Sequence, residues 1–214
     1  MSAVSPPAWD TSYEQAEAAI ANLALARIGA NLIADTTEDT PSSRQARAIF
    51  AATRDELLRD YEFNFAKASQ TLSEDAVFAY KGSWSYAFTV PTSPVILKIL
   101  SISGNTDNLY EVVGSGANRR LLANVTTTTG PNVLQVQYVA QVIDPSTWDS
   151  LFKDALVLRL ASKLAMPLVK RADLAQVIQQ EFAAIFTLAK TASSQERQLD
   201  ESEPLWTDRA AVRK

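Results

Sequence analysis

The sequence predicts an α+β fold, in which a bundle of four main helices carries an inserted small antiparallel β region. Apolar residues recur at helical spacing over residues 11–29, 42–61, 145–166 and 171–191. Between residues 62 and 143 the apolar residues alternate instead, as in half-buried strands. The order helix, helix, strands, helix, helix is typical of an α+β subunit and argues against a parallel, doubly wound sheet.

The composition excludes several classes of function. The chain has 214 residues, of which 47% are hydrophobic, so it is long enough to bury a core. It contains no cysteine and no histidine, which removes disulfides, the usual zinc sites, thiol catalysis and histidine acid–base chemistry. The formal net charge is −4, so we do not expect the whole surface to bind nucleic acid. No cofactor is expected.

The N-terminal residues favour a soluble protein that is made in the cytoplasm. Residues 1–7 have neither the basic start nor the apolar core of a signal peptide. No apolar run approaches the roughly 20 residues that a membrane span needs. A membrane partner is therefore not expected.

The first helix is predicted to be buried on more than one side. Ser12 and Gln15 fit a capping box, and Gly29 is well placed to end the helix. Apolar side chains occupy nearly every side between these signals: Ala19, Ile20, Ala21, Leu23, Ala24, Leu25, Ala26 and Ile28. Such a helix has more than one neighbour. The second neighbour is either another helix of the same chain or another subunit.

The second helix is predicted to begin near Pro41 and to run into a strand. After Tyr61, the aromatic residues Phe63 and Phe65 occupy alternate positions, as in a half-buried strand. A helix that is followed directly by a strand fixes a corner of the fold. We expect these aromatic side chains to fill that corner as core residues.

The remaining strands of the β region are separated by turn residues. They are predicted at residues 84–90, 95–102, 109–113, 120–124 and 133–142. The segment Gly114-Ser115-Gly116 resembles the start of a phosphate loop. It lacks the Lys-Ser/Thr and the helix that such a loop needs, so we expect a hairpin turn between two strands.

The C-terminal third is predicted to be a helical hairpin followed by a tail. Asp144 as N-cap and Pro145 mark the start of the third helix, and Pro167 marks its end. The fourth helix follows closely and should pack antiparallel to the third. Residues 193–214 are polar and charged, apart from the apolar pair Leu205-Trp206. This extended tail is either an unstructured end or a segment that is disordered in the free subunit and orders on a partner.

Three stretches of the chain resemble the head-to-tail adaptor family of tailed phages. In short-tailed phages this adaptor is called tail tubular protein A. They are Leu25–Gly29, Arg54–Ala66 and Tyr138–Leu168, the last of which carries the Asp144-Pro145 cap and the pair Trp148-Asp149. None of these motifs carries chemistry. The resemblance depends on their order and spacing, and it covers about residues 12–192.

The resemblance implies a structural function for the chain. Residues 1–192 would form an adaptor domain, and copies of it, commonly twelve, would form a ring between the portal and the tail nozzle or tail tube. The ring would extend the channel through which phage DNA passes without sequence-specific binding. The expected location is the virion, at the portal vertex.

The resemblance also assigns a partner to the tail, residues 193–214. In relatives the C-terminal segment clasps the portal protein. By position and composition, the candidate portal-binding residues here are Leu205, Trp206, Arg209 and Arg213.

Two other interpretations remain open. One is a different phage connector, such as a tail completion or stopper protein, or a helical binding module outside phages. The other is a carboxylate-based hydrolase that uses two of the acids Glu14, Glu17, Asp55, Glu56 and Asp60. We expect these acids to form solvated pairs along the polar faces of helices, beside Arg54 and Arg59, so an enzymatic function is not favoured.

The loop of residues 31–41 carries three further acids, Asp35, Glu38 and Asp39. Their spacing does not follow that of the regular calcium-binding loops. We therefore expect a solvated acidic loop and no metal site.

Overall fold

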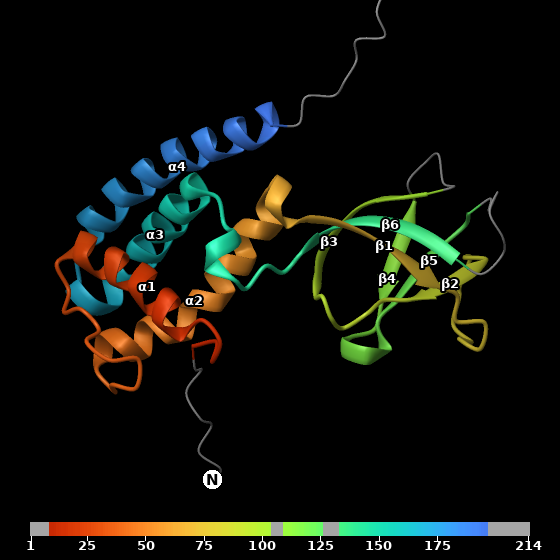
Figure 1. Cartoon of the computed structure of the whole chain (residues 1–214), viewed down its shortest axis with the longest axis horizontal. Helices are drawn as coiled ribbons and strands as arrows, with labels where there is room; N and C mark the ends of the chain where they lie inside the picture. Colours follow the sequence, from red (N-terminus) through yellow and green to blue (C-terminus); the bar gives the residue numbers. More distant parts are fainter. Residues whose placement is uncertain (1–8, 104–108, 126–132, 197–214) are drawn as a thin grey trace, which may run out of the picture.

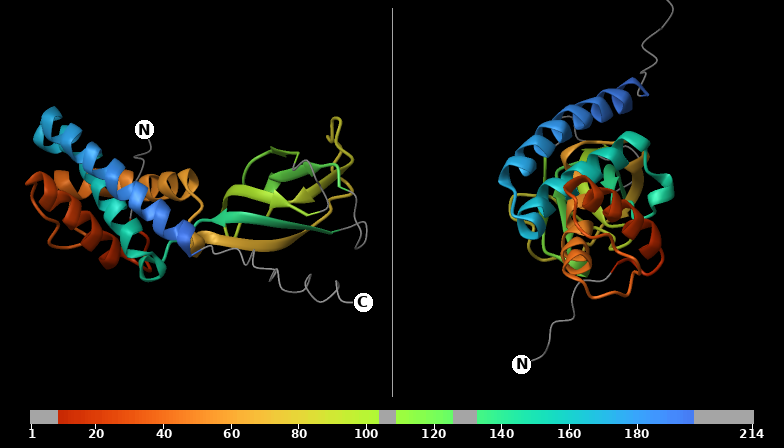
Figure 2. Two further views of the ribbon diagram at one scale, coloured as in Figure 1. Left: turned by 90° about the horizontal axis from the view of Figure 1, so that it is seen from above. Right: turned by 90° about the vertical axis from the view of Figure 1, so that its left-hand side faces the viewer.

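The computed structural model describes residues 9–103, 109–125 and 133–196, in which four α-helices and two antiparallel sheets form an α+β structure, as predicted. The helices form one end of the molecule, here called the helical body: α1 (Glu14–Ile28), α2 (Pro41–Asp60), α3 (Ser150–Leu164) and α4 (Ala172–Gln195). The strands form the other end, here called the β module: β1 (Lys67–Ser73), β2 (Tyr86–Thr89), β3 (Ile96–Ile102), β4 (Tyr110–Val113), β5 (Arg120–Ala123) and β6 (Val133–Ala140). Figures 1 and 2 show body and module end to end, joined by the segments that follow α2 and precede α3.

The central helix of the body is α3, against which α1, α2 and α4 all pack. Phe152, Leu156 and Leu160 of α3 are fully buried. The expectation that α1 has more than one neighbour is confirmed, because α1 contacts both α3 and α2. However, α1 is not buried on every side, since Leu23 is 58% exposed.

The start of α1 differs from the prediction. The helix begins at Glu14, and its N-cap Tyr13 makes no side-chain capping bond, so the capping box predicted from Ser12 and Gln15 is wrong. The carboxylate of Asp10 accepts the N–H of Ser12 instead, at 3.0 Å. The end is as predicted, because Gly29 adopts the left-handed conformation with φ of 69°.

The second helix begins as predicted, with Thr40 as N-cap, but no strand begins at Phe63. Residues Asn64–Ala66 form the 3-10 turn η1, and β1 starts only at Lys67. Phe63 packs against two helices, with its ring 5.1 Å from that of Phe152 and 6.1 Å from that of Phe186. Alternation of aromatic residues therefore reflects packing onto the helical core here. Phe63 is a core residue, as predicted, whereas Phe65 is partly buried.

The β module consists of two three-stranded antiparallel sheets, with strand orders β1-β6-β3 and β2-β5-β4. The apolar core between them includes Leu134, Val136 and Tyr138 of β6 together with Phe88 and Leu121. The predicted alternation along β6 is thus confirmed. At the end of β6, Val139 faces the other way and belongs to the core of the helical body.

The glycine-rich segment after β4 is a turn of the β4–β5 hairpin, as predicted. Gly114 has φ of 78°, and a Cβ atom there would lie 2.3 Å from the carbonyl oxygen of Asn118. The turn leads through a 3-10 turn, Gly116–Asn118, into β5 and not into a helix. A phosphate loop is therefore excluded.

The helical hairpin has other boundaries than predicted. Asp144 and Pro145 begin a 3-10 turn, and α3 starts at Ser150 with Asp149 as its N-cap. Pro167 does not end the helix, because a π-helical turn of Ala165–Val169 carries the chain past it; the wider turn accommodates a residue without an N–H. The last helix, α4, continues to Gln195, so the first residues of the predicted tail are helical.

Candidate functional site

A buried group of charged side chains links α1, α2 and the exit of the β module. Arg54 of α2 and Glu17 of α1 are 3% and 2% exposed. The guanidinium of Arg54 lies 3.5 Å from Glu17 Oε1 and 2.8 Å from Asp55 Oδ1. Asp55 also accepts a hydrogen bond of 2.6 Å from the side chain of Gln141, which follows β6. We call these four residues the buried charge cluster.

The buried charge cluster also holds the segment before α1, because Glu17 Oε2 accepts the backbone N–H of Asp10 at 3.0 Å. Burial raises the pKa of Glu17, and the Asp10 N–H and the charge of Arg54 oppose that rise. Both carboxylates are occupied by donors of the chain itself. This arrangement favours a positioning role over substrate chemistry.

A groove of about 550 Å³ lies between α2 and α4, with α3 beneath it; we call it the α2–α4 groove. Arg159 of α3 lies in it, with its guanidinium 2.6 Å from Glu56 Oε1 and 5.3 Å from the ring centre of Phe182. Lys163 also pairs with Glu56. Burial would raise the pKa of Glu56, but the hydrogen bonds from Lys163 and Arg159 outweigh it and lower that pKa.

Lys190 of α4 pairs with Asp60, which lines the α2–α4 groove. The Lys190 ammonium lies 3.3 Å from Asp60 Oδ2 and 4.1 Å from the ring centre of Phe186. Arg59 also lines the groove, and its side chain makes no hydrogen bond or ion pair within the described part of the chain. The groove therefore has Phe182 at its base and is lined by two cations and two carboxylates, and Lys163 and Lys190 pair with those carboxylates.

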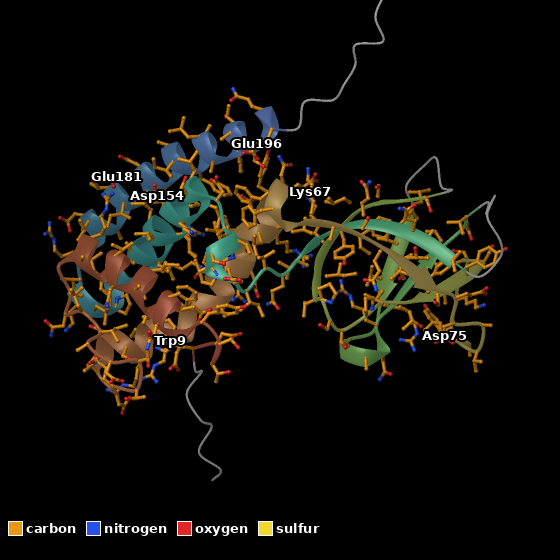
Figure 3. The ribbon with its side chains drawn as sticks, in the orientation of Figure 1. Trp9, Lys67, Asp75, Asp154, Glu181 and Glu196 are labelled. Atoms are coloured by element: carbon orange, nitrogen blue, oxygen red, sulfur yellow. The ribbon has the colours of Figure 1, made fainter. Side chains whose placement is uncertain are left out.

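The last turn of α4 is bound to the segment that leaves α2; we call this junction the waist. The hydroxyl of Tyr61 donates to the carbonyl of Lys190 at 2.9 Å. Asn64 donates its backbone N–H to Ser193 Oγ at 3.1 Å and its side-chain amide to the carbonyl of Ser193 at 2.6 Å. Figure 3 shows Glu196 at this end of α4, on the side of the β module where Lys67 begins β1. The chain beyond residue 196 therefore starts at the waist.

The outward face of α4 carries almost no charge. Its exposed residues in the centre of the helix are Val177, Gln180, Ala184, Thr187, Leu188 and Thr191. From Leu174 to Ala189 the only charged residue is Glu181, which pairs with Arg27 of α1 at 2.9 Å. The outward face of α1 is similar, with the exposed residues Ala16, Ala19, Leu23 and Ala26. Solvated helix faces normally carry charged residues, so these two faces are unusual.

The structure corrects the expectation for the five carboxylates considered for a hydrolase. Glu17 is buried, so it does not form a solvated pair, and Asp55 pairs with the buried Arg54. The physical reason is that Arg54 points into the interior, where two carboxylates neutralise it.

Of the other three carboxylates, Glu56 and Asp60 both line the α2–α4 groove. Glu56 and Asp60 pair with cations of α3 and α4, and not with residues along their own helix. Glu14 lies in the first turn of α1. Four of the five, Glu17, Asp55, Glu56 and Asp60, are thus paired with cations of the chain itself.

The carboxylates of the acidic loop hold the loop itself. Asp35 accepts the N–H and the hydroxyl of Thr37, at 2.7 and 2.6 Å, and these bonds lower its pKa. Glu38 accepts the Thr40 hydroxyl at 2.8 Å and the N–H of Ala34 at 3.1 Å. In the described ranges, no group of three or more acidic side chains is placed to hold a metal ion.

The candidate portal-binding residues Leu205, Trp206, Arg209 and Arg213 lie outside the described residues. Sequence reasoning did not identify the α2–α4 groove or the buried charge cluster. The groove left one local signal, since Arg159 and Lys163 lie one turn apart on α3.

Comparison of the sequence with models of protein families and with curated proteins finds no match. Within the described residues, no helix combines the length and the apolar character that crossing a bilayer requires.

Proposed function

We propose that the chain is a structural head-to-tail adaptor of a tailed phage. In this proposal its four helices form the bundle of one subunit, and copies of the subunit stand side by side in a ring, commonly of twelve, between the portal and the tail nozzle or tail tube. The ring is part of the virion. It extends the channel for phage DNA and binds no specific DNA sequence.

The observation that carries the proposal is the uncharged outward face of α4. Val177 and Leu188 are 53% and 55% exposed, and they lie on the same side of the helix, three turns apart. A helix of 24 residues that is covered by water is expected to carry charges along its outer face. A face without them fits a surface that a neighbouring subunit covers.

The outward face of α1 supports the same proposal. The sequence indicates a helix with two neighbours, and the structure leaves one of its apolar faces open. In a ring, two different faces of each subunit meet in a heterologous contact that closes on itself. The faces of α1 and α4 supply two such surfaces on one helical body.

The ion pairs that occupy four of the five carboxylates support a structural function. The net charge of −4 fits a channel wall that does not retain DNA. In this proposal the tail, residues 193–214, leaves the body at the waist and reaches the portal, where Leu205, Trp206, Arg209 and Arg213 bind. The free protein is then monomeric or weakly associated, and the portal serves as the template for the ring.

The test compares two double variants of the full chain. Val177→Glu with Leu188→Glu places charges on the outward face of α4. Val77→Glu with Leu109→Glu adds the same charges at exposed apolar residues of the β module, which are 90% and 60% exposed, and serves as the matched control.

Negative-stain images of each protein mixed with the portal of the same phage provide the measurement. We expect ring-capped portals with the wild type and the control, and at least tenfold fewer with the α4 variant. Equal ring formation by both variants would exclude the α4 face as the contact. A wild type that ignores the portal would exclude the adaptor function and favour another connector or a binding module.

A further inference from the structure

The α2–α4 groove has the features of a peptide-binding surface for an acidic segment with an aromatic anchor. Phe182 and Leu57 lie at its base, where they are 8% and 2% exposed. Arg59 and Arg159 line it together with the carboxylates Glu56 and Asp60. Lys163 and Lys190 pair with these two carboxylates, so the charged group at the groove has four cations and two carboxylates in the described structure. This local excess of positive charge stands out on a chain whose net charge is −4.

Arg59 is the residue that indicates which kind of ligand the groove would bind. Each of the other three cations already pairs with Glu56 or Asp60. Arg59 is exposed at the groove, and its guanidinium has no acidic partner in the described ranges. A carboxylate arriving from outside the described residues would therefore find a cation without displacing an existing pair.

A segment of matching chemistry lies in the same chain. Residues 199–206 read Leu-Asp-Glu-Ser-Glu-Pro-Leu-Trp, with three carboxylates and no cation. Trp206 is the largest apolar side chain of the tail, and tryptophan is enriched among the residues that dominate binding surfaces. Acidic residues next to an aromatic anchor complement a groove with cations around an aromatic base.

The length of the chain allows this segment to reach the groove. The described structure ends at Glu196 at the waist, and Trp206 follows ten residues later. Ten extended residues span up to about 33–36 Å. The groove residue Gln179 lies 17 residues before Glu196 along α4, which corresponds to about 26 Å of helix. A segment that folds back from the waist along α4 therefore reaches Phe182 with length to spare.

We propose that residues 199–206 dock in the α2–α4 groove of their own chain, with Trp206 against Phe182 and the carboxylates toward Arg59. The docked segment is a parked position of the tail in the free subunit. A partner that binds the tail must displace it from the groove. This contact goes beyond the proposed function, because it forms without a portal and without a second copy.

Because the chain contains no cysteine, two introduced cysteines report the contact directly. Ala183→Cys lies one turn after Gln179 on the groove side of α4, and Thr207→Cys follows the Trp206 anchor. The control combines Thr207→Cys with Ala19→Cys, an exposed alanine on the outward face of α1. The rate of disulfide formation in a glutathione buffer is followed on non-reducing gels, using the full chain.

We expect the Ala183 pair to close within one chain at least tenfold faster than the Ala19 pair. Adding Arg59→Glu or Trp206→Ala should reduce the rate to that of the control, whereas Arg44→Glu, remote from the groove on α2, should not. Equal rates for both pairs would show a tail that is disordered in the free subunit and would overturn the proposal. Disulfide-linked dimers would place the segment in the groove of a second copy and would also overturn it.

Because no portal is present in this experiment, its outcome is independent of the adaptor function. A chain that parks its tail but ignores the portal would retain this inference and lose the proposed function. A chain that forms rings but shows no fast disulfide formation would retain the proposed function and lose this inference.

Discussion

The helical body and the β module are stabilised in different ways. The body encloses charges, since Arg54 and Glu17 are almost fully buried where α1 meets α2. The β module has ion pairs nearer the surface, such as that of Arg120 and Asp75, whose side chains are 16% and 21% exposed. The interior of the module is an apolar layer between two sheets, with Phe88 and Leu121 fully buried.

This difference shows which part of the structure specifies an arrangement. An apolar layer between two sheets fixes the register of the strands, because a slip would expose the buried face. A buried ion pair instead fixes how α1 and α2 pack, because separating the two buried charges would raise the free energy of the fold. The two regions have separate cores, and Val139 of β6 belongs to the core of the helical body.

The largest expected effect on stability comes from removing one buried aromatic ring from each of the two cores. Phe63→Ala and Phe88→Ala each remove a ring that is at most 1% exposed, and each should lower the free energy of unfolding by about 3–5 kcal/mol. Phe63 lies between the two regions and contacts α3 and α4, so its loss should reduce hydrogen-exchange protection in the helices. Phe88→Ala should reduce protection in the β module alone.

The measurements are urea unfolding for the free energy and hydrogen exchange for its location. If Phe88→Ala lowered helical protection as much as Phe63→Ala, the two regions would be one cooperative unit and the comparison would fail.

A smaller effect is expected from Arg54→Met, which keeps the volume but leaves Glu17 and Asp55 without their cation. The loss should be about 3 kcal/mol at neutral pH, because a buried unpaired charge remains. Burial already raises the pKa of Glu17, and removing Arg54 raises it further. The penalty is therefore fully present above that pKa and falls as the pH drops through it, since protonated Glu17 needs no cation.

Thermal unfolding of Arg54→Met at several pH values checks this prediction. The double variant Glu17→Gln with Arg54→Met is the control and should recover part of the loss at neutral pH. A penalty that is independent of pH would mean that packing, and not charge, dominates at Arg54.

The smallest effect is expected at the waist. Asn64→Ala removes the side-chain bond to the Ser193 carbonyl, which should cost about 1–2 kcal/mol. Hydrogen exchange should show the loss in the last turn of α4 and leave α1 unchanged. Asn22→Ala serves as a comparison, because it removes similar amide bonds to Ile33 in a loop far from the waist. Equal loss of protection in α4 for both variants would contradict a local role for Asn64.

The helices and most strands could be predicted because their patterns extend over many residues. The long helices α2 and α4 and the alternating strand β6 are examples. The predicted helix boundaries were wrong where the same local sequence signal is compatible with two different structures. Asp144-Pro145 caps a 3-10 turn as readily as an α-helix, and a π-helical turn carries Pro167 without ending the helical region.

The candidate site could be predicted only in part. The contact between Glu17 and Arg54 joins two helices across a loop, and no local pattern shows which carboxylate an arginine will meet. The α2–α4 groove likewise needs three helices to come together. By contrast, the uncharged face of α4 is visible in the sequence, since Glu181 is the single charge between Leu174 and Ala189.

The last turn of α4 has a mechanical consequence. Any force that is applied to the chain beyond residue 196 enters the fold at Ser193, which is held by the backbone and side chain of Asn64. Asn64 belongs to the connection between the helical body and the β module. Tension on the C-terminal segment is thus transmitted to the junction of the two regions before it reaches the core of either. Tension on that segment would therefore change the angle between the helical body and the β module.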